Sequence, residues 1–139
     1  MAKQKKRIIL TGAQGVGKTT LMNMLSGIYK PDSGTIKVDG VPVSIHSPED
    51  SKKFGIGMVH QHFKLVEVFS AADNMWMGTE HTGFILKKDR YNKITEISEK
   101  FGFEFNPKKI VANMSVSEKQ TLEILRVLYY GAKVIILDE

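Results

Sequence analysis

The chain has 139 residues, of which 42% are apolar and 25% charged, a composition typical of one soluble globular domain. No apolar stretch approaches the roughly 20 residues of a membrane-spanning helix, and the absence of cysteine excludes disulfides and agrees with a cytoplasmic setting. The net charge is +5, but four positive charges lie in one run, Lys3–Arg7, without which 16 basic side chains face 15 acidic ones; because no aromatic residue interleaves with that run, we interpret it as a solvated segment and expect no nucleic-acid partner.

The first predicted elements are a strand, a glycine-rich loop and a helix. Arg7–Thr11 is a short β-branched run that predicts a strand. Gly12–Thr19 reads GAQGVGKT, which fits the phosphate-loop pattern G-x-x-x-x-G-K-[ST] at every fixed position. Apolar residues then recur at helical spacing and predict a helix, namely Leu21, Met22, Met24, Leu25 and Ile28.

This loop predicts a site for a polyphosphate. Glycines let backbone N–H groups turn inward around phosphates, Lys18 reaches the outer phosphates, and Thr19 offers a hydroxyl to Mg²⁺. A helix that begins just after the loop adds unpaired N–H groups that attract an anion. The candidate phosphate-binding residues are Gly12, Ala13, Gln14, Gly15, Val16, Gly17, Lys18, Thr19 and Thr20. The alternative is a glycine-rich turn with a chance lysine.

A β-hairpin follows. Thr35–Val38 and Val41–Ile45 predict its strands, and Asp39-Gly40 between them favours a two-residue turn. Ser47 and Pro48 predict the start of a short helix. Ile56–Val59 predicts a strand that ends at His60-Gln61-His62, whose two histidines lack the third ligand of a zinc site and are interpreted as non-ligands.

The middle of the chain is predicted to be helical, and its end to be a strand. Ser70–Gly78, Asp89–Phe101 and Ser115–Tyr130 predict helices; the apolar stripe of the second is Tyr91, Ile94, Ile97 and Phe101, and that of the third is Leu122, Leu125, Leu128 and Tyr129. Met75, Trp76 and Met77 are interpreted as packing residues rather than a partner surface. Ser115 and Glu118 predict a capping box. Val134–Leu137 is fully apolar and predicts a strand buried on both faces.

The chain closes on a second chemical motif. Val134–Leu137 would deliver Asp138 and Glu139 at its carboxyl end, where open α/β sheets place their ligands. Asp138 could hold the Mg²⁺ that bridges the phosphates, and Glu139 could polarise an attacking water. This pattern alone is weak evidence for a nucleotide-hydrolysis site, and it becomes stronger evidence when a phosphate loop is also present. The alternative is that Glu139 is simply a frayed terminal residue.

Together these motifs resemble the ATP-binding subunit of ABC transporters over essentially the whole chain. The carrying elements, in order, are GAQGVGKT, PDSG, Gln61, MSVSEKQ and VIILDE. The run GIGMVHQHF (Gly55–Phe63) looks like the ATPases of bacterial importers for nucleosides and simple sugars, especially the first half of their tandem ATP-binding proteins. The resemblance implies an α/β P-loop NTPase core with a mostly parallel sheet, a β-hairpin and a helical insertion, forming one partial domain over residues 1–139 with a helical subdomain at about 64–113.

The same resemblance implies ATP and Mg²⁺ as cofactors, and a role for each motif. Gly12–Thr20 would wrap the phosphates, and Thr19, Gln61 and Asp138 would hold the metal. Glu139 would be the catalytic base, with Gln61 at the attacking water. Ser115, Val116, Ser117 and Glu118 would form the signature that caps ATP on a second ATP-binding domain, in a homo- or tandem dimer. The helical subdomain would dock on transmembrane permease subunits, which implies a peripheral place at the cytoplasmic face of the membrane.

The sequence departs from the family pattern in three ways. Ser117 stands where the family normally has glycine. An adenine-stacking aromatic residue upstream, and the D-loop and switch histidine downstream, do not occur in the sequence. We therefore expect a domain truncated at both ends, which binds nucleotide weakly and turns over little ATP by itself.

Three alternatives stay open at this point. One is a module that binds nucleotide without hydrolysing it. Another is an inert or structural fragment. The third is a P-loop kinase or GTPase unrelated to transport, which would have no use for Gln61 or for the segment that begins at Ser115.

Overall fold

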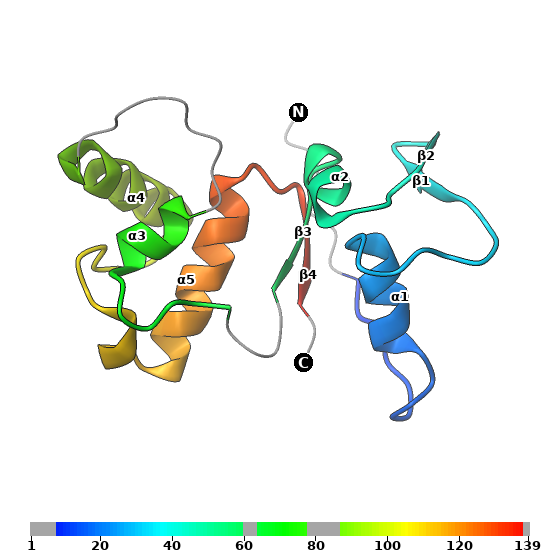
Figure 1. Cartoon of the computed structure of the whole chain (residues 1–139), viewed down its shortest axis with the longest axis horizontal. Helices are drawn as coiled ribbons and strands as arrows, with labels where there is room; N and C mark the ends of the chain where they lie inside the picture. Colours follow the sequence, from blue (N-terminus) through cyan, green and yellow to red (C-terminus); the bar gives the residue numbers. More distant parts are fainter. Residues whose placement is uncertain (1–7, 60–63, 78–86, 138–139) are drawn as a thin grey trace. The chain divides into compact units, whose positions relative to one another are not determined.

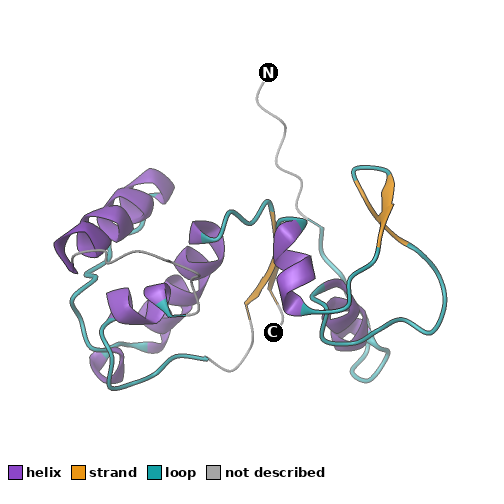
Figure 2. Cartoon of the chain, turned by 45° about the horizontal axis from the view of Figure 1, so that its top comes forward, coloured by secondary structure: helices purple, strands orange, loops and turns teal. Residues whose placement is uncertain are grey.

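The computed structural model describes residues 8–59, 64–77 and 87–137, with the side chains of residues 87 and 88 left out. The chain divides into two compact units, Met1–Phe54 and Gly55–Glu139. Figure 1 shows the order of the elements along the chain, and Figure 2 distinguishes helices from strands.

The first unit holds two helices and a hairpin. Helix α1 (Lys18–Leu25) follows the glycine-rich loop, strands β1 (Ile36–Val38) and β2 (Val41–Val43) pair antiparallel, and helix α2 (Pro48–Lys53) follows them. The two-residue turn between the strands is confirmed, with both turn residues, Asp39 and Gly40, at positive φ (50° and 84°). Ser47 caps α2 by accepting from the Asp50 N–H, as expected.

The ends of α1 and α2 pack closely. Gly27 has φ 79°, and a Cβ placed on it would lie 2.2 Å from the carbonyl oxygen of Ser47. The Ser51 hydroxyl also donates to the carbonyl oxygen of Leu25 (3.0 Å). Only a residue without a side chain fits at Gly27, because both its backbone conformation and the space beside it exclude a Cβ.

The predicted strand over Arg7–Thr11 is wrong for the part that is described. Residues 8–11 adopt no regular structure, and Ile8 and Ile9 are 91% and 85% exposed. β-Branched residues favour strands only when a neighbouring strand supplies hydrogen bonds and burial. Within the described residues no strand pairs with this segment. The predicted helix also ends earlier than its apolar spacing suggested, so Ile28 lies beyond α1 and is exposed.

The second unit combines a parallel strand pair with helices. Strand β3 (Ile56–Val59) pairs in parallel with β4 (Val134–Leu137), from Ile56 opposite Val134 to Val59 opposite Leu137. Between the strands come α3 (Ala71–Trp76), α4 (Lys87–Phe101), a 3₁₀ turn η1 (Val111–Asn113) and α5 (Val116–Tyr129). The crossover between β3 and β4 thus carries all of these helices, as a parallel pair requires a long connection.

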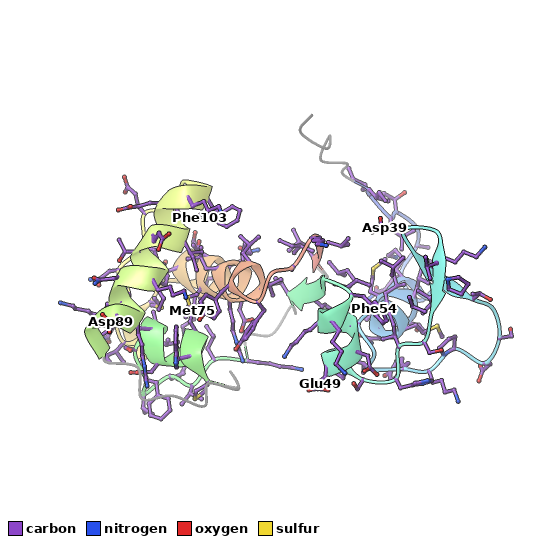
Figure 3. All side chains as sticks on the ribbon, turned by 90° about the horizontal axis from the view of Figure 1, so that it is seen from above. Asp39, Glu49, Phe54, Met75, Asp89 and Phe103 are labelled. Atoms are coloured by element: carbon purple, nitrogen blue, oxygen red, sulfur yellow. The ribbon has the colours of Figure 1, made fainter. Side chains whose placement is uncertain are left out.

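A hydrophobic core holds the helices together. Figure 3 shows Met75 of α3 among the helices α3, α4 and α5. Asp89 marks the first turn of α4, and Phe103 follows the end of that helix. The fully buried core side chains come from α3, α4, η1 and α5; they are Ala71, Met75, Ile94, Val111, Leu122 and Leu125. The predicted apolar stripes lie in this core or pack against it, except Leu128 and Phe101. Phe101, the last residue of α4, is 39% exposed.

The predicted burial of β4 on both faces is also wrong. Ile136 is buried, but Val134 and Leu137 are 54% and 58% exposed. The described residues build a sheet of only two strands here, so β4 has one strand neighbour, whereas a strand covered on both faces lies inside a larger sheet.

Candidate functional site: the phosphate loop and the start of α5

The phosphate loop folds through glycines in left-handed conformation. Gly15 and Gly17 have φ of 84° and 92°, values that cost other residues roughly 1–2 kcal/mol. A Cβ on Gly12 would lie 3.1 Å from Cγ2 of Val16, so the start of the loop also has little room for a side chain. Residues 12–17 are exposed, which leaves the loop open to a ligand.

Lys18 closes this loop on itself. Its Nζ donates to the carbonyl oxygens of Gly12 (2.8 Å) and Ala13 (2.7 Å), six and five residues back along the chain. An ammonium group has three N–H donors, and these carbonyls take two of them. The ammonium group is therefore held at the loop, where it can bind an anion without first being ordered.

Helix α1 contributes its N-terminus to the same place. Gly17 is its N-cap and supplies no side-chain hydrogen bond to the first N–H groups. The first-turn N–H groups have no partner inside a helix, and the helix dipole makes this end positive. Thr19 and Thr20 lie exposed in this first turn. The loop and the first turn of α1 thus supply backbone donors, an ammonium group and hydroxyls, a donor set that is chemically suited to the oxygens of a polyphosphate and to a hard cation such as Mg²⁺.

The predicted capping box at the start of α5 is present. Ser115 Oγ accepts from the Glu118 N–H (3.2 Å), and Glu118 Oε2 accepts from the Ser115 N–H (2.8 Å). Lys109, which precedes the 3₁₀ turn, adds a salt bridge that sequence reasoning missed: its Nζ lies 2.7 Å from Glu118 Oε1. The Lys109 ammonium, followed by the backbone N–H of Ser115, lowers the pKa of Glu118 from 4.5 to about 2.

The rest of this helix start faces outward. Val116 is 71% exposed and Ser117 is exposed, although the Ser117 carbonyl oxygen accepts from the Thr121 hydroxyl (3.0 Å). The structure thus presents Ser115, Val116 and Ser117 at an accessible helix N-terminus. Lys119 is tied down by a salt bridge to Glu67 (3.0 Å).

Gln61, Asp138 and Glu139 lie outside the described residues, as do His60 and His62. The strands that precede them are described: Val59 of β3 lies opposite Leu137 of β4 in a parallel pair. The two strands therefore end at the same edge of the sheet. The phosphate loop belongs to the unit Met1–Phe54, and β3, β4 and α5 belong to the unit Gly55–Glu139.

Sequence reasoning also missed two hydrogen bonds between the segment that follows β3 and helix α5. The Lys64 N–H donates to Glu123 Oε1 (3.2 Å), and Arg126 Nη1 donates to the Lys64 carbonyl oxygen (3.4 Å). These partners are about 60 positions apart, and no local pattern links them. The one available signal was a charged residue, Glu123, next to the apolar stripe of α5.

The fold, the loop and the parallel strand pair together define the P-loop class of nucleotide-binding proteins. A solved relative is cbiO1 of Clostridium perfringens, described as part of the ABC transporter complex cbiONQ, which is 30% identical with a TM-score of 0.72 over 92% of this chain and 51% of that one. A nucleotide-free ATP-binding cassette from an ABC transporter, 20% identical, shares the fold with a TM-score of 0.74 over 91% and 55% of the two chains.

Within that class, the ABC transporter family profile matches residues 2–139, and the chain belongs to this family. It is 44% identical over 132 residues to the guanosine import ATP-binding protein NupO of Bacillus subtilis (strain 168), which covers 94% of this chain. It is 39% identical over 132 residues, again 94% of this chain, to the galactose/methyl galactoside import ATP-binding protein MglA of Escherichia coli (strain K12).

The chain spans about a quarter of the length of these curated relatives, 26% in both cases. Among the helices of the described residues, none combines the length and the apolar character needed to cross a membrane.

Proposed function

We propose that this chain binds MgATP as part of an ATP-hydrolysing subunit that energises the import of a nucleoside or a simple sugar. The observation that carries the proposal is the phosphate loop, in which Lys18 Nζ is held by the carbonyl oxygens of Gly12 and Ala13 at the N-terminus of α1. The relatives, a guanosine import ATP-binding protein and a galactose/methyl galactoside import ATP-binding protein, supply the solute class.

The loop residues have distinct roles in this proposal. The backbone N–H groups of residues 12–20 and the ammonium of Lys18 bind the phosphate oxygens and neutralise their charge. Thr19, Gln61 and Asp138 supply the hydroxyl, amide and carboxylate oxygens that suit Mg²⁺. A metal ion held there would stabilise the negative charge of the phosphate oxygens; the protein's own part is to hold the phosphates in line for attack.

Two residues act on the attacking water. Glu139 accepts hydrogen bonds from the water and raises its nucleophilicity, and Gln61 helps to orient it. Little covalent chemistry is required from the protein, since phosphoryl transfer depends mainly on position and on electrostatic stabilisation.

The signature residues Ser115, Val116, Ser117 and Glu118 cap ATP that is bound to a second ATP-binding domain, in a homo- or tandem dimer. Support comes from the exposed N-terminus of α5, whose N–H groups and dipole favour an anion. Ser117 keeps the backbone N–H but adds a side chain where the family normally has glycine. Because the signature of a second domain completes each nucleotide site in this proposal, we expect weak binding and little turnover by this chain in isolation.

The partners and location follow from the same proposal. Residues 1–139 act as one partial ATP-binding domain, in which residues of about 64–113 form a helical subdomain that contacts transmembrane permease subunits. The chain then works at the cytoplasmic face of the membrane, where ATP is available.

The test is a titration of the melting temperature with MgATP. A specific binder is stabilised by about 2.7 kcal/mol at a hundredfold excess over Kd, which raises the melting temperature by several degrees. Lys18→Ala should abolish the shift, because it removes the charge that closes the loop. Lys30→Ala, an exposed lysine of the same unit outside the loop, is the matched control.

Further arms of the titration separate the alternatives. Equal shifts for the chain and for Lys18→Ala, or no shift at all, would overturn nucleotide binding at this loop. A preference for GTP, or transfer of phosphate to an added acceptor, would favour the unrelated GTPase or kinase. ATP turnover that needs the second domain would be lost on Glu139→Gln, while MgATP binding remains.

A further inference from the structure

Helix α1 meets the phosphate loop at one end and is anchored at the other. Its first turn, where Lys18 lies, is largely exposed, and none of the side chains that the structure describes in α1 is buried. Burial begins directly after the helix, at Ser26 and Gly27. Apolar side chains of its own therefore do not fix the direction of α1, and the contacts at its C-terminal end have to do so.

The carbonyl groups of the last turn show where α1 is anchored. A helix leaves its last four carbonyl oxygens without partners inside the helix. The three before Leu25 accept backbone N–H groups from the residues that directly follow the helix. The carbonyl oxygen of Leu25 instead accepts from the Ser51 hydroxyl of α2 at 3.0 Å, across 26 positions of the sequence. The end of α1 is thereby tied to a second helix (Figure 1).

The junction between the two helices is closely packed. Ser51 is 2% exposed and is the buried residue of α2. A Cβ placed on Gly27 would lie 2.2 Å from the carbonyl oxygen of Ser47 and 3.0 Å from Cγ2 of Ile45. Among the described residues of this unit, the buried side chains are those of Ile45, Ser26 and Ser51. The unit therefore has its tightest packing where α1 ends.

A hydroxyl at this position is explained by its hydrogen bond. Burying a hydroxyl is unfavourable unless it is hydrogen-bonded, and alanine would fill nearly the same space. What Ser51 adds to the packing is therefore the bond to the Leu25 carbonyl oxygen.

The length of α1 transmits this contact to the loop. Eight residues extend about 12 Å, so a tilt of about 10° at the anchored end displaces the first turn by about 2 Å. A displacement of that size is larger than a hydrogen bond tolerates. It would change how the first N–H groups of the helix and the Lys18 ammonium meet a phosphate.

We infer that Ser51 is a positioning residue: by holding the carbonyl end of α1, it fixes the direction of the helix and so the N–H groups and the Lys18 ammonium at the phosphate loop. The inference rests on the proposed function and deepens it, because it adds a residue outside the loop on which MgATP affinity depends. The effect is reciprocal: since the anchor favours binding, an occupied loop strengthens the anchor.

The first experiment measures hydrogen exchange and needs no nucleotide. Ser51→Ala should speed exchange of the Leu21 amide, which donates to the Gly17 carbonyl oxygen, about fivefold, the factor that one ordinary hydrogen bond contributes. The Phe54 amide, which donates to the Asp50 carbonyl oxygen of α2, should change less. No change at Leu21, or an equal change at both amides, would overturn the inference.

Ser26→Ala is the matched control. Ser26 is also a buried serine at the end of α1, and its hydroxyl donates to the Asn23 carbonyl oxygen at 3.2 Å. That bond does not reach α2, so its loss should leave exchange at Leu21 near the wild-type rate. If Ser26→Ala speeds this exchange as much as Ser51→Ala does, any lost bond at the helix end has the same effect, and the inference fails.

The second experiment adds MgATP to the full chain. Ser51→Ala should weaken MgATP affinity about fivefold, and Ser26→Ala should leave it unchanged. At saturating MgATP, exchange of the Phe54 amide should slow in wild type and in Ser26→Ala. It should not slow in Ser51→Ala, because the bond that links α1 to α2 is missing. A merely structural role of Ser51 would leave this protection of α2 intact at saturation, which overturns the inference.

Failure of the inference can be told apart from failure of the proposed function. If wild type binds no MgATP, or if Lys18→Ala binds as well as wild type, the proposed function fails and the inference fails with it. If wild type binds in a Lys18-dependent manner but Ser51→Ala binds equally well, only the inference fails.

Discussion

At the scale of single residues, Gly57 shows how closely β3 and α5 pack. A Cβ placed on Gly57 would lie 2.2 Å from Cγ1 of Val127 and 3.2 Å from the Cβ of Ala132. Valine is β-branched and cannot rotate freely in a helix, so the clash is not relieved by a simple side-chain movement. The absence of a side chain here, rather than backbone freedom, is what the fold requires.

We therefore predict that Gly57→Ala destabilises the chain by about 1–3 kcal/mol, the usual cost of overpacking. Urea unfolding followed by circular dichroism measures it. The double variant Gly57→Ala/Val127→Ala should lose less stability than the two single variants added together, because it removes the clashing methyl. Strict additivity of the two losses would contradict the proposed contact.

At the scale of elements, the start of α5 is held by charge as well as by its cap. Glu118 has a folded-state pKa of about 2, against an ordinary value of 4.5. A lowered folded-state pKa means that the stabilisation is present above pH 4.5 and is lost as the pH falls toward 2. Protonated Glu118 neither pairs with Lys109 nor accepts a strong hydrogen bond from the Ser115 N–H.

The corresponding prediction concerns Glu118→Gln. Its melting temperature should lie below that of wild type at pH 6 to 7, and the gap should narrow as the pH is lowered from about 4.5 to about 2. Lys109→Met should lower the melting temperature at neutral pH in the same direction. A gap that stays constant over this pH range would show that the Glu118 charge does not contribute.

The elements also show what sequence can predict. The hairpin turn at Asp39-Gly40 and the capping box of Ser115 and Glu118 were predicted correctly, because each depends on residues within four positions. The strand at Arg7–Thr11 and the double-sided burial of β4 were wrong, because both depend on partners far along the chain.

The candidate site shows the same difference between features set by neighbouring residues and features set by distant ones. The phosphate loop and the start of α5 could be located from their own residues. The salt bridge from Lys109 to Glu118 crosses a 3₁₀ turn, and the hydrogen bond from Lys64 to Glu123 joins residues 59 positions apart. Contacts of that kind depend on tertiary packing, and no periodicity in a single sequence encodes them.

At the scale of the whole molecule, buried apolar side chains are unevenly distributed between the two units. The hydrophobic core lies in the unit Gly55–Glu139, around Leu122 and Leu125. Among described residues of the unit Met1–Phe54, Ile45 is the only apolar side chain that is buried, and α1 buries none of its own. Because local stability depends on how many apolar side chains are buried, the two units should differ in local stability.

We predict that native-state hydrogen exchange resolves this difference. The amides of Leu122 and Leu125 should exchange most slowly, and those of α1 much faster, because few apolar contacts oppose the opening of α1. Saturating MgATP should slow exchange in α1, and Lys18→Ala should remove that protection. Equal exchange rates in α1 and in the core of α5 would contradict the prediction.

Trp76 gives the helical unit an optical label of its own. It is the single tryptophan of the sequence and lies 9% exposed, with its ring centroid 5.4 Å from that of Tyr129 and the Arg90 guanidinium carbon 5.6 Å from its ring centre. Its fluorescence therefore depends on the packing of α3, α4 and α5. The phosphate loop contains no tryptophan, so a change in emission on adding MgATP would report that the helical unit responds to an occupied loop.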